Sequence, residues 1–327
     1  MRRFFLITFF SFPIIMAVYL VNAVCLQGNT GFKMDKTQNG LLISGVTQEI
    51  NSVQKNDLII SMHGLSYHEF LGFFITGSIA AKPMANKIGT MTILRDSKKI
   101  EIPVNTVTFT VIPLLKILWP QILLMIVFLS LGTTGLLRAP PSPQATLFFL
   151  MLCGLATSLA MTIPSSTGLL SPLPFSLAFI IHAAANWVSF GLWVHFALRF
   201  PASRDFILHK PWIPFLIYFI PAVTTIGASL YAAGISYDFW GWVQRLRNLY
   251  LPFIIIGVFV KHALDYKFAK NRQVKDQVKL PLIGYWLTFS PYLFLYLLPN
   301  LLLDAPLISF RTVLFAFFIL PVAYLAG

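Results

Sequence analysis

One apolar run carries polar side chains at spacings of four, three and four residues, which place them on one face of a helix. These side chains are His182, Asn186, Ser189 and Trp193. An imidazole, an amide, a hydroxyl and an indole on a shared face could line a ligand-binding pocket or a crevice between helices. The other interpretation is structural, because polar side chains inside a bilayer often hold neighbouring helices together by hydrogen bonds.

The sequence lacks the common motifs of soluble active sites. It contains no His-Glu-x-x-His zinc motif, no phosphate loop and no Gly-x-Ser-x-Gly elbow. Asp265, near the end of one apolar run, is the only Asp or Glu inside such runs, whereas proton-driven transporters usually need buried carboxylates. His195 and His262 lie on different runs, without a Cys-x-x-Cys-His haem motif. We therefore assign no catalytic residue and expect no metal and no cofactor.

The composition indicates that lipid is the main solvent of this chain. Its 327 residues are 57% hydrophobic and 11% charged, whereas ordinary soluble chains have about 25% charged residues. The net charge of +13 would suggest nucleic acid as the partner of a soluble protein. Here, however, Lys and Arg gather at the ends of apolar runs, which is a topology signal. We expect membrane lipid, and no nucleic acid, as a partner.

About eight runs are apolar enough to cross a bilayer as helices, which need about 20 residues each. They cover residues 4–24, 109–131, 145–163, 175–198, 212–232, 250–264, 280–298 and 310–325. Arg2 and Arg3 precede the first run and favour a cytoplasmic N-terminus. A cleaved signal peptide ending near Ala23 is the alternative for that run.

Alternation of these runs from a cytoplasmic N-terminus collects the basic loops on the same side. The residues concerned are Arg138, Arg199, Arg204, Lys210, Lys267, Lys270, Arg272, Lys275 and Lys279. Arg245 and Arg247 oppose this pattern. We therefore predict a multi-pass protein of an inner or plasma membrane with both termini in the cytoplasm. Tyr285, Tyr292 and Tyr296 are expected to be anchors at the membrane interface.

Residues 27–107 differ from the rest of the chain. They hold many charged residues and four short, β-branched-rich segments, 41–46, 58–62, 90–94 and 100–104, bounded by turn residues. We therefore expect a mostly α fold in three parts. Residues 1–26 form the first transmembrane helix, 27–107 form a small β-rich (α+β) extracytoplasmic domain, and 108–327 form a bundle of seven transmembrane helices.

The extracytoplasmic segment resembles a PDZ domain. The resemblance lies in the turn Asn39-Gly40 before a strand, in Val53-Gln-Lys-Asn-Asp57 before an apolar strand and Gly64, and in Thr92-Ile-Leu-Arg-Asp96. It implies binding of an extended peptide at a sheet edge, with its carboxylate held by backbone amides. The binding loop would comprise Thr30, Gly31, Phe32, Lys33 and Met34. A PDZ-shaped domain used for packing or dimerisation is the alternative.

The membrane part is similar to the sensor region of bacterial histidine kinases of the competence-pheromone-receptor type. Two segments carry the similarity, His195-Phe-Ala-Leu-Arg-Phe-Pro201 and Ile319-Leu-Pro-Val-Ala-Tyr324. The similarity implies a homodimer whose cytoplasmic kinase would follow Gly327 in a longer chain, so that enzymatic activity belongs to a missing part. Pro201 must end its helix. His195, Phe200 and Pro201 form either a simple helix end or a hinge for signalling.

We therefore expect a receptor in a two-component signalling system that detects an extracytoplasmic peptide or amphiphilic ligand. Ligand binding would shift the bundle between two arrangements with different ligand affinity. A multi-span transporter or a membrane accessory protein, with the PDZ-like domain binding a substrate or partner, is the alternative. Inverted repeats or broken helices would favour the transporter.

Overall fold

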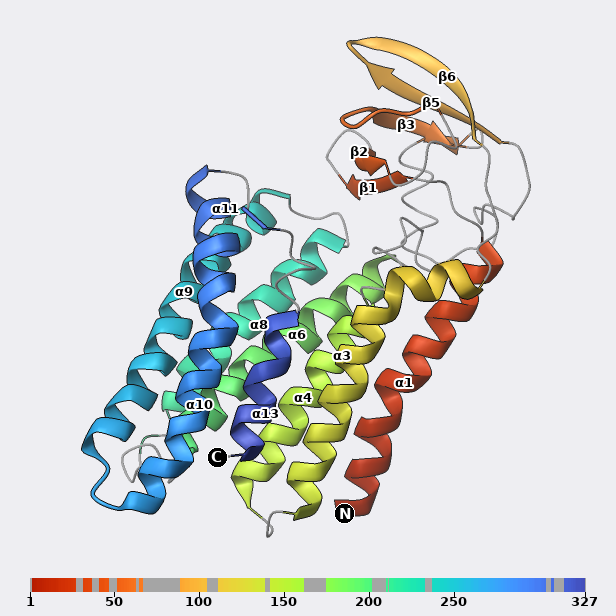
Figure 1. Ribbon diagram of the computed structural model, residues 1–327. Helices are drawn as coiled ribbons and strands as arrows, with labels where there is room; N and C mark the ends of the chain where they lie inside the picture. The colour runs from red at the N-terminus through yellow and green to blue at the C-terminus, as the bar shows by residue number, and fades with distance from the viewer. Residues whose placement is uncertain are drawn as a thin grey trace.

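The computed structural model describes residues 2–27, 32–36, 41–46, 52–62, 65–66, 89–104, 111–138, 142–161, 175–201, 210, 212–232, 237–303, 307–308 and 315–326. Helices form a bundle, and a small β-sheet lies beyond one end of it (Figure 1). The two chain termini lie at the opposite end, N below α1 and C beside α13 (Figure 1). The sheet and the termini are thus separated by the length of the bundle.

The bundle consists mainly of long apolar helices. They are α1 (Arg2–Gln27), α3 (Val111–Arg138), α4 (Pro143–Met161), α6 (Phe175–Arg199), α8 (Trp212–Ala232), α9 (Tyr237–Phe268) and α10 (Arg272–Pro291). The chain continues from α10 through the π-helix η2 (Tyr292–Leu297) into α11 (Leu298–Leu303), and it ends with the 3₁₀-helix η3 (Phe315–Phe318) and α13 (Ile319–Ala326). The change from α-helix to π-helix comes directly after Pro291, which has no backbone N–H to donate.

Six of the described helices are long and apolar enough to cross a membrane, α3, α4, α6, α8, α9 and α10 with η2. The expected multi-span helical architecture is therefore confirmed. The expected number of eight spans is not confirmed. The apolar stretch of α1, Ile7–Val21, is shorter than such a span, and the last run is described only over residues 315–326.

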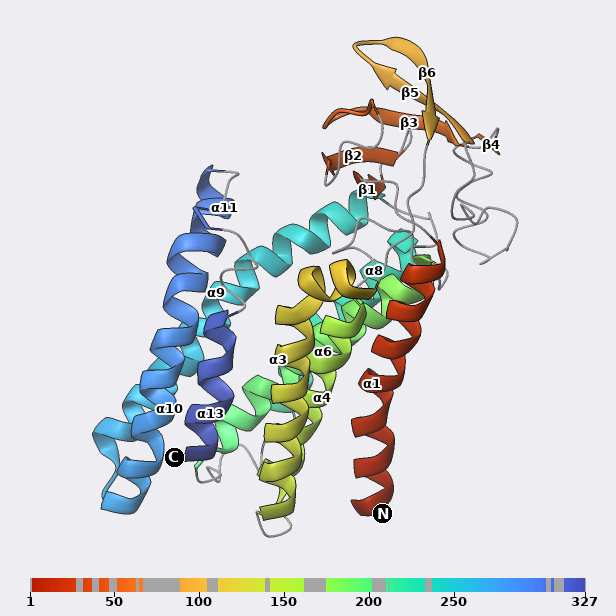
Figure 2. The ribbon, with the colours of Figure 1, turned by 45° about the vertical axis from the view of Figure 1, so that its right-hand side comes forward.

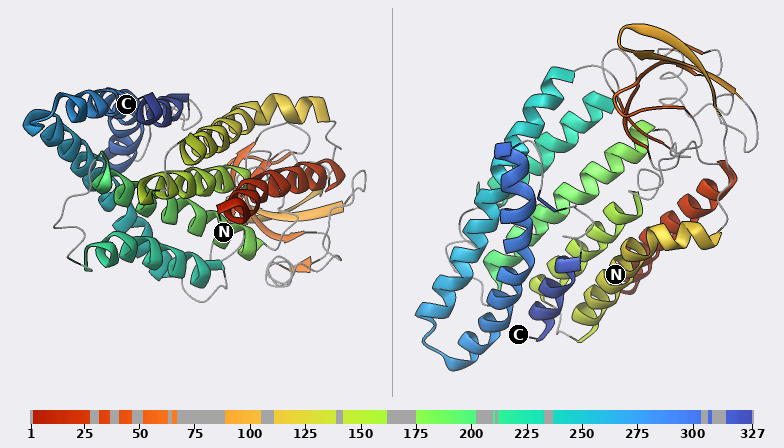
Figure 3. Two further views of the ribbon diagram at one scale, coloured as in Figure 1. Left: turned by 90° about the horizontal axis from the view of Figure 1, so that it is seen from below. Right: turned by 45° about the horizontal axis from the view of Figure 1, so that its top comes forward.

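The helices form two lobes. In the first lobe, α4 packs against α3, α6 and α1, and α8 packs against α6. In the second lobe, α10 packs against both α9 and α13. Figures 2 and 3 show α9, α10 and α13 as a group beside α3, α4 and α6. The lobes meet where α9 contacts α8 and α6, and where η3 and α13 contact α3.

Small residues allow the helices of the first lobe to approach closely. A Cβ atom on Gly154 of α4 would lie 2.1 Å from the Ser189 Oγ of α6. A Cβ atom on Gly191 of α6 would lie 2.9 Å from a ring carbon of Tyr218 on α8. Since lipid supplies little hydrophobic drive between helices, close van der Waals packing at such positions has to hold the lobe together.

The sheet is antiparallel and has the strand order β1 (Phe32–Lys36), β2 (Leu41–Val46), β3 (Leu58–Met62), β5 (Gly89–Arg95) and β6 (Lys98–Val104). A short strand, β4 (Leu65–Ser66), also pairs with β3. All four strands predicted between residues 41 and 104 are present. Their buried side chains, Ile43, Ile59, Met91, Ile93 and Ile102, form the core of this domain. Along β5, buried Met91 and Ile93 alternate with half-buried Thr92 and Leu94, which fits a sheet with one more deeply covered face.

A buried ion pair joins two strands of this sheet. The side chain of Asp57 is 2% exposed and accepts hydrogen bonds from the Arg95 guanidinium at 2.8 and 2.7 Å. The Gln54 backbone N–H donates to the same carboxylate at 2.7 Å. Burial acts to raise the pKa of Asp57, but these hydrogen bonds outweigh burial and hold the pKa below its ordinary value.

We predict that Asp57→Asn destabilises the sheet by about 1–3 kcal/mol, because it weakens a buried, charge-assisted hydrogen-bond network. Amide hydrogen exchange of β3 and β5 in the full chain should quicken, whereas the exposed Asp96→Asn should leave it unchanged. A depressed folded-state pKa contributes stability above the ordinary value of about 3.9 and loses it as the pH falls through the folded value. The difference between wild type and Asp57→Asn should therefore shrink in acid.

Candidate functional site

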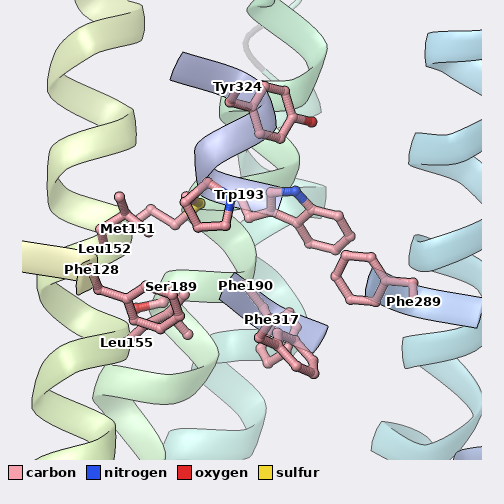
Figure 4. Close-up of a pocket in the computed structure, with 11 residues that line it drawn as sticks. Phe128, Met151, Leu152, Leu155, Ser189, Phe190, Trp193, Phe289, Phe317 and Tyr324 are labelled. Atoms are coloured by element: carbon pink, nitrogen blue, oxygen red, sulfur yellow. The ribbon is translucent and has the colours of Figure 1, made fainter. Parts of the chain in front are cut away.

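An apolar cavity lies where the two lobes meet, and we call it the lobe cavity. It is small, because the centre of a water-sized molecule has only about 40 Å³ in which to move. Figure 4 shows the residues that line it. They are Phe128, Met151, Leu152, Leu155, Ser189, Phe190, Trp193, Phe289, Phe317, Pro321 and Tyr324. Helices α3, α4 and α6 thus supply one side of the cavity, and α10, η3 and α13 supply the other.

The polar face predicted on α6 divides between two roles. Ser189 and Trp193 line the lobe cavity. His182 instead meets α4, where its Nδ1 lies 3.1 Å from the Ser158 hydroxyl and 3.2 Å from the Ser158 carbonyl oxygen. Asn186 is half-buried and does not line the cavity. The N-terminal part of this face, at His182, therefore packs against α4, and the C-terminal part, at Ser189 and Trp193, faces the cavity.

Trp193 connects the first lobe to α10. Its side chain is 4% exposed, and its ring stacks on Tyr285 and Phe289, with centroid separations of 5.5 and 5.0 Å. Aromatic pairs in such geometry add about 0.5–1.5 kcal/mol each beyond their buried area. The prediction that Tyr285 anchors the chain at the membrane interface is wrong, because Tyr285 is 1% exposed and its hydroxyl donates to the Ile255 carbonyl oxygen at 2.6 Å.

Tyr324 on α13 contacts both lobes. Its ring packs edge-on against Phe196 and Phe200 of the α6 segment, with centroids 5.0 and 5.2 Å apart. It also meets Phe148 of α4 at 6.4 Å. The two segments that carry the resemblance to sensor kinases, 195–201 and 319–324, therefore touch through Phe200 and Tyr324.

A chain of two buried hydrogen bonds holds the hydroxyl group of Tyr324. The His262 side chain is fully buried, and its Nδ1 lies 2.9 Å from the Val258 carbonyl oxygen of the same helix. Because a carbonyl oxygen only accepts, Nδ1 must donate, which leaves Nε2 of a neutral imidazole as an acceptor. The Tyr324 hydroxyl lies 2.9 Å from Nε2 and donates to it. This bond links α13 to α9 where water is absent.

The indole N–H of Trp193 faces Tyr324 (Figure 4). It is buried and lies at the margin of hydrogen-bond geometry with the Tyr324 hydroxyl. The Tyr324 oxygen donates its hydrogen to His262 and keeps a lone pair that can accept this N–H. The cavity wall therefore contains a marginal polar contact between α6 and α13.

The expected hinge residues lie at the end of α6. This helix ends at Arg199, and the Phe200 N–H still donates to the Phe196 carbonyl oxygen at 2.9 Å. The Lys261 ammonium of α9 donates to the Phe200 carbonyl oxygen. His195 lies with its Nδ1 3.2 Å from the Tyr218 hydroxyl of α8. Pro201 comes two residues after the last residue of the helix, as expected for a helix stop.

Part of the predicted peptide-binding loop lies outside the described residues. This applies to Thr30 and Gly31. Phe32, Lys33 and Met34 belong to β1, where they pair with β2 across a register shift between Lys33 and Met34. Strand β1 occupies the end of the described strand order, so one of its edges has no described strand partner.

The sequence did not indicate which residues of α9, α10 and α13 complete the site. Tyr285 and Phe289 share a helix face at a spacing of four residues, and both are buried. Their burial could have been suspected, because the run also carries Trp286 and Leu287, which are exposed and face away. The pairing of His262 with Tyr324, 62 residues apart in sequence, has no signal in a single chain.

We predict that Gly284→Ala displaces α13. A Cβ atom at this position would lie 2.4 Å from the Ala323 Cβ, so the change should cost about 1–3 kcal/mol through overpacking. The thermal midpoint of the purified protein in micelles should fall. Gly257→Ala is the control, since no atom lies within 4 Å of its Cβ position and Ala favours a helix over Gly. Equal shifts of the thermal midpoint in both variants would contradict the close approach of Gly284 to Ala323.

We also predict that Tyr324→Phe lowers the free energy of unfolding by about 1–3 kcal/mol, because it leaves the buried His262 Nε2 without a donor. The same thermal measurement applies, with the exposed Tyr19→Phe as control. A double-mutant cycle with His262→Phe should show coupling of about 0.5–3 kcal/mol. Simple additivity would mean that the two residues do not stabilise one another.

The site thus combines an apolar cavity with an aromatic cluster that connects both lobes to the last helix. No group of three His, Cys, Asp or Glu side chains gathers within the described ranges. What the arrangement offers is binding and mechanical coupling between helices.

No protein-family model, no curated protein and no solved structure matches this chain.

Proposed function

We propose that this chain is the membrane sensor region of a bacterial two-component histidine kinase. In this proposal it works as a homodimer in the inner or plasma membrane, with both termini in the cytoplasm and the β-rich, PDZ-like domain outside. It detects an extracytoplasmic peptide or amphiphilic ligand and passes the signal through α13 to a cytoplasmic kinase. The contact of Tyr324 with both lobes is the observation that carries the proposal.

The mechanism needs two arrangements of the lobes with different ligand affinity. Tyr324 supports such a mechanism, because any shift of α9 against α6 must change its contacts with His262 or with Phe200. The marginal contact between the Trp193 N–H and the Tyr324 oxygen supports it too, because a small shift of α13 against α6 would strengthen or break this contact. Movement at the cavity would then turn or shift α13.

The charge distribution supports the proposed orientation. Arg138 and Arg199 lie in the last turns of α3 and α6, and Lys267 lies in the last turn of α9. These helix ends lie at the same end of the bundle as the termini, opposite the sheet (Figure 1). Basic residues are retained on the cytoplasmic side of membranes.

The test begins with the native reading frame beyond residue 327. The protein it encodes would be placed in phospholipid vesicles and incubated with radiolabelled ATP. We expect autophosphorylation, and a change of several-fold in its rate in Tyr324→Phe and Gly284→Ala, whereas Tyr19→Phe and Gly257→Ala should behave as wild type. The proposal would be overturned if the reading frame encodes no kinase. It would also be overturned if none of the four substitutions alters the autophosphorylation rate.

A transporter is the second candidate, because the lobe cavity lies between two groups of helices, as substrate sites of transporters often do. Alternating access would expose the cavity to each side of the membrane in turn. Cysteines introduced at Leu152 and Leu155 would then react with membrane-impermeant thiol reagents from both sides. The sensor proposal expects no such labelling, since the cavity is apolar and stays within the bilayer.

A further inference from the structure

Positive charge gathers where α9 ends and α10 begins, and we call residues 266–279 the basic hairpin. Five of the 24 Lys and Arg residues of the chain lie in this short segment, but only one of its 11 Asp and Glu residues, Asp276. The five are Lys267, Lys270, Arg272, Lys275 and Lys279. Figure 1 shows the turn between the two helices at the end of the bundle that lies opposite the sheet.

The backbone of the basic hairpin is well defined. Helix α9 ends at Phe268, and α10 begins at Arg272 after the turn 269–271. Asn271 caps α10, because its side-chain oxygen accepts a hydrogen bond from the Gln273 N–H at 2.9 Å. The Lys275 ammonium lies 5.3 Å from the centre of the Tyr266 ring, so a cation–π contact joins the two helices. The charges are therefore carried by one structured surface.

The chain itself neutralises little of this charge. The Nε of Arg272 lies 4.0 Å from Asp276, and the two side chains are 95% and 71% exposed, so this pair contributes little. Asp265, the next acidic residue in the sequence, is paired with Lys261 at 2.7 Å. Among the described residues, no carboxylate lies at ion-pair distance from the four lysines of the hairpin. Most of the positive charge is thus left for a partner outside the chain.

The direction of α10 adds to the positive potential. Its first turn contains Arg272 and Lys275 and no acidic residue. The backbone N–H groups at the start of a helix carry partial positive charge, which favours acidic side chains there and disfavours basic ones. The sequence therefore places cations where the helix itself stabilises them least. Anions from outside would relieve this repulsion over the whole hairpin.

The basic hairpin lies at the depth of lipid headgroups. The apolar segment Arg272–Leu297 has 26 residues, which span about 39 Å and exceed the hydrocarbon core by about 9 Å. The polar residues of this segment stand at its start, so the excess length lies in the first turns of α10. Phe268 is 68% exposed, and the Lys267 ammonium lies 5.4 Å from its ring centre. An exposed aromatic ring beside a cation is typical of the membrane interface.

We propose that the basic hairpin binds the phosphate headgroups of anionic phospholipids in the surrounding leaflet. Clusters of Lys and Arg next to a membrane-spanning helix attract such lipids. A phosphatidylcholine headgroup attracts them less, because its own choline cation offsets its phosphate. An acidic protein segment would also match the charge, but lipid phosphates already surround the hairpin at this depth. This site goes beyond the proposed sensor function and does not depend on it.

The test uses the full chain in phosphatidylcholine vesicles with a trace of spin-labelled phosphatidylglycerol or spin-labelled phosphatidylcholine. Electron spin resonance distinguishes lipid slowed by contact with the protein from free lipid, and so compares the association of the two headgroups. We expect phosphatidylglycerol to associate about threefold more strongly with the wild type. Combining Lys267→Gln, Lys270→Gln and Arg272→Gln should at least halve this preference. High salt should weaken it in the wild type.

Two control variants separate the hairpin from net charge and from structural disturbance. Combining Lys55→Gln, Lys98→Gln and Lys99→Gln removes the same charge from exposed positions of the sheet domain and should leave the preference unchanged. Combining Lys267→Arg and Lys270→Arg with Arg272→Lys retains the charge of the hairpin and should also retain the preference.

Equal association of both lipids with the wild type would overturn the proposal and leave an acidic protein segment as the partner of the hairpin. An equal loss of preference in the sheet variant would also overturn it, because net charge and not the hairpin would then attract the lipid. The assay contains no phosphorylation step. Its outcome is therefore independent of whether the chain belongs to a kinase.

Discussion

The absence of water around the helices is the constraint on which the rest of this structure depends. In hydrocarbon, each polar group must find its partner within the protein. His182 therefore bonds to Ser158 across two helices, Tyr285 bonds to a carbonyl of α9, and Tyr324 bonds to His262. The same constraint leaves the lobe cavity apolar, since its polar neighbours already have partners within the bundle or are turned aside.

The hydrogen bond from Tyr324 to His262 has an importance beyond its own strength. The tyrosine ring rests on Phe196 and Phe200 of one lobe, while its hydroxyl is held by the other. The contacts of this single side chain on α13 therefore depend on the relative position of both lobes. A shift of one lobe against the other would break contacts of this one side chain.

Patterns local in sequence were predictable from this chain, and contacts between distant segments were not. Hydrophobic run length located the helices, and β-branched segments between turn residues located strands such as Leu41–Val46 and Leu58–Met62 to the residue. Helical spacing placed Ser189 and Trp193 on one face. The partners of that face, Tyr285 and Phe289, depend on how α10 packs against α6, and periodicity within one helix carries no information about its neighbours. The span count stays unconfirmed at the chain ends, because the apolar stretch of α1 covers only Ile7–Val21 and the last run is described only over residues 315–326.

The two kinds of helix contact in this bundle differ in how they tolerate mutation. At Gly154 and Gly191, any side chain larger than hydrogen collides with the next helix, so the first lobe has almost no freedom to vary there. Where Trp193 lies on Tyr285 and Phe289, the contact is made by ring faces, so a smaller side chain leaves a gap instead of a collision. A larger residue in the first lobe therefore pushes helices apart, whereas a smaller residue at the boundary removes the contact that holds the two groups of helices together.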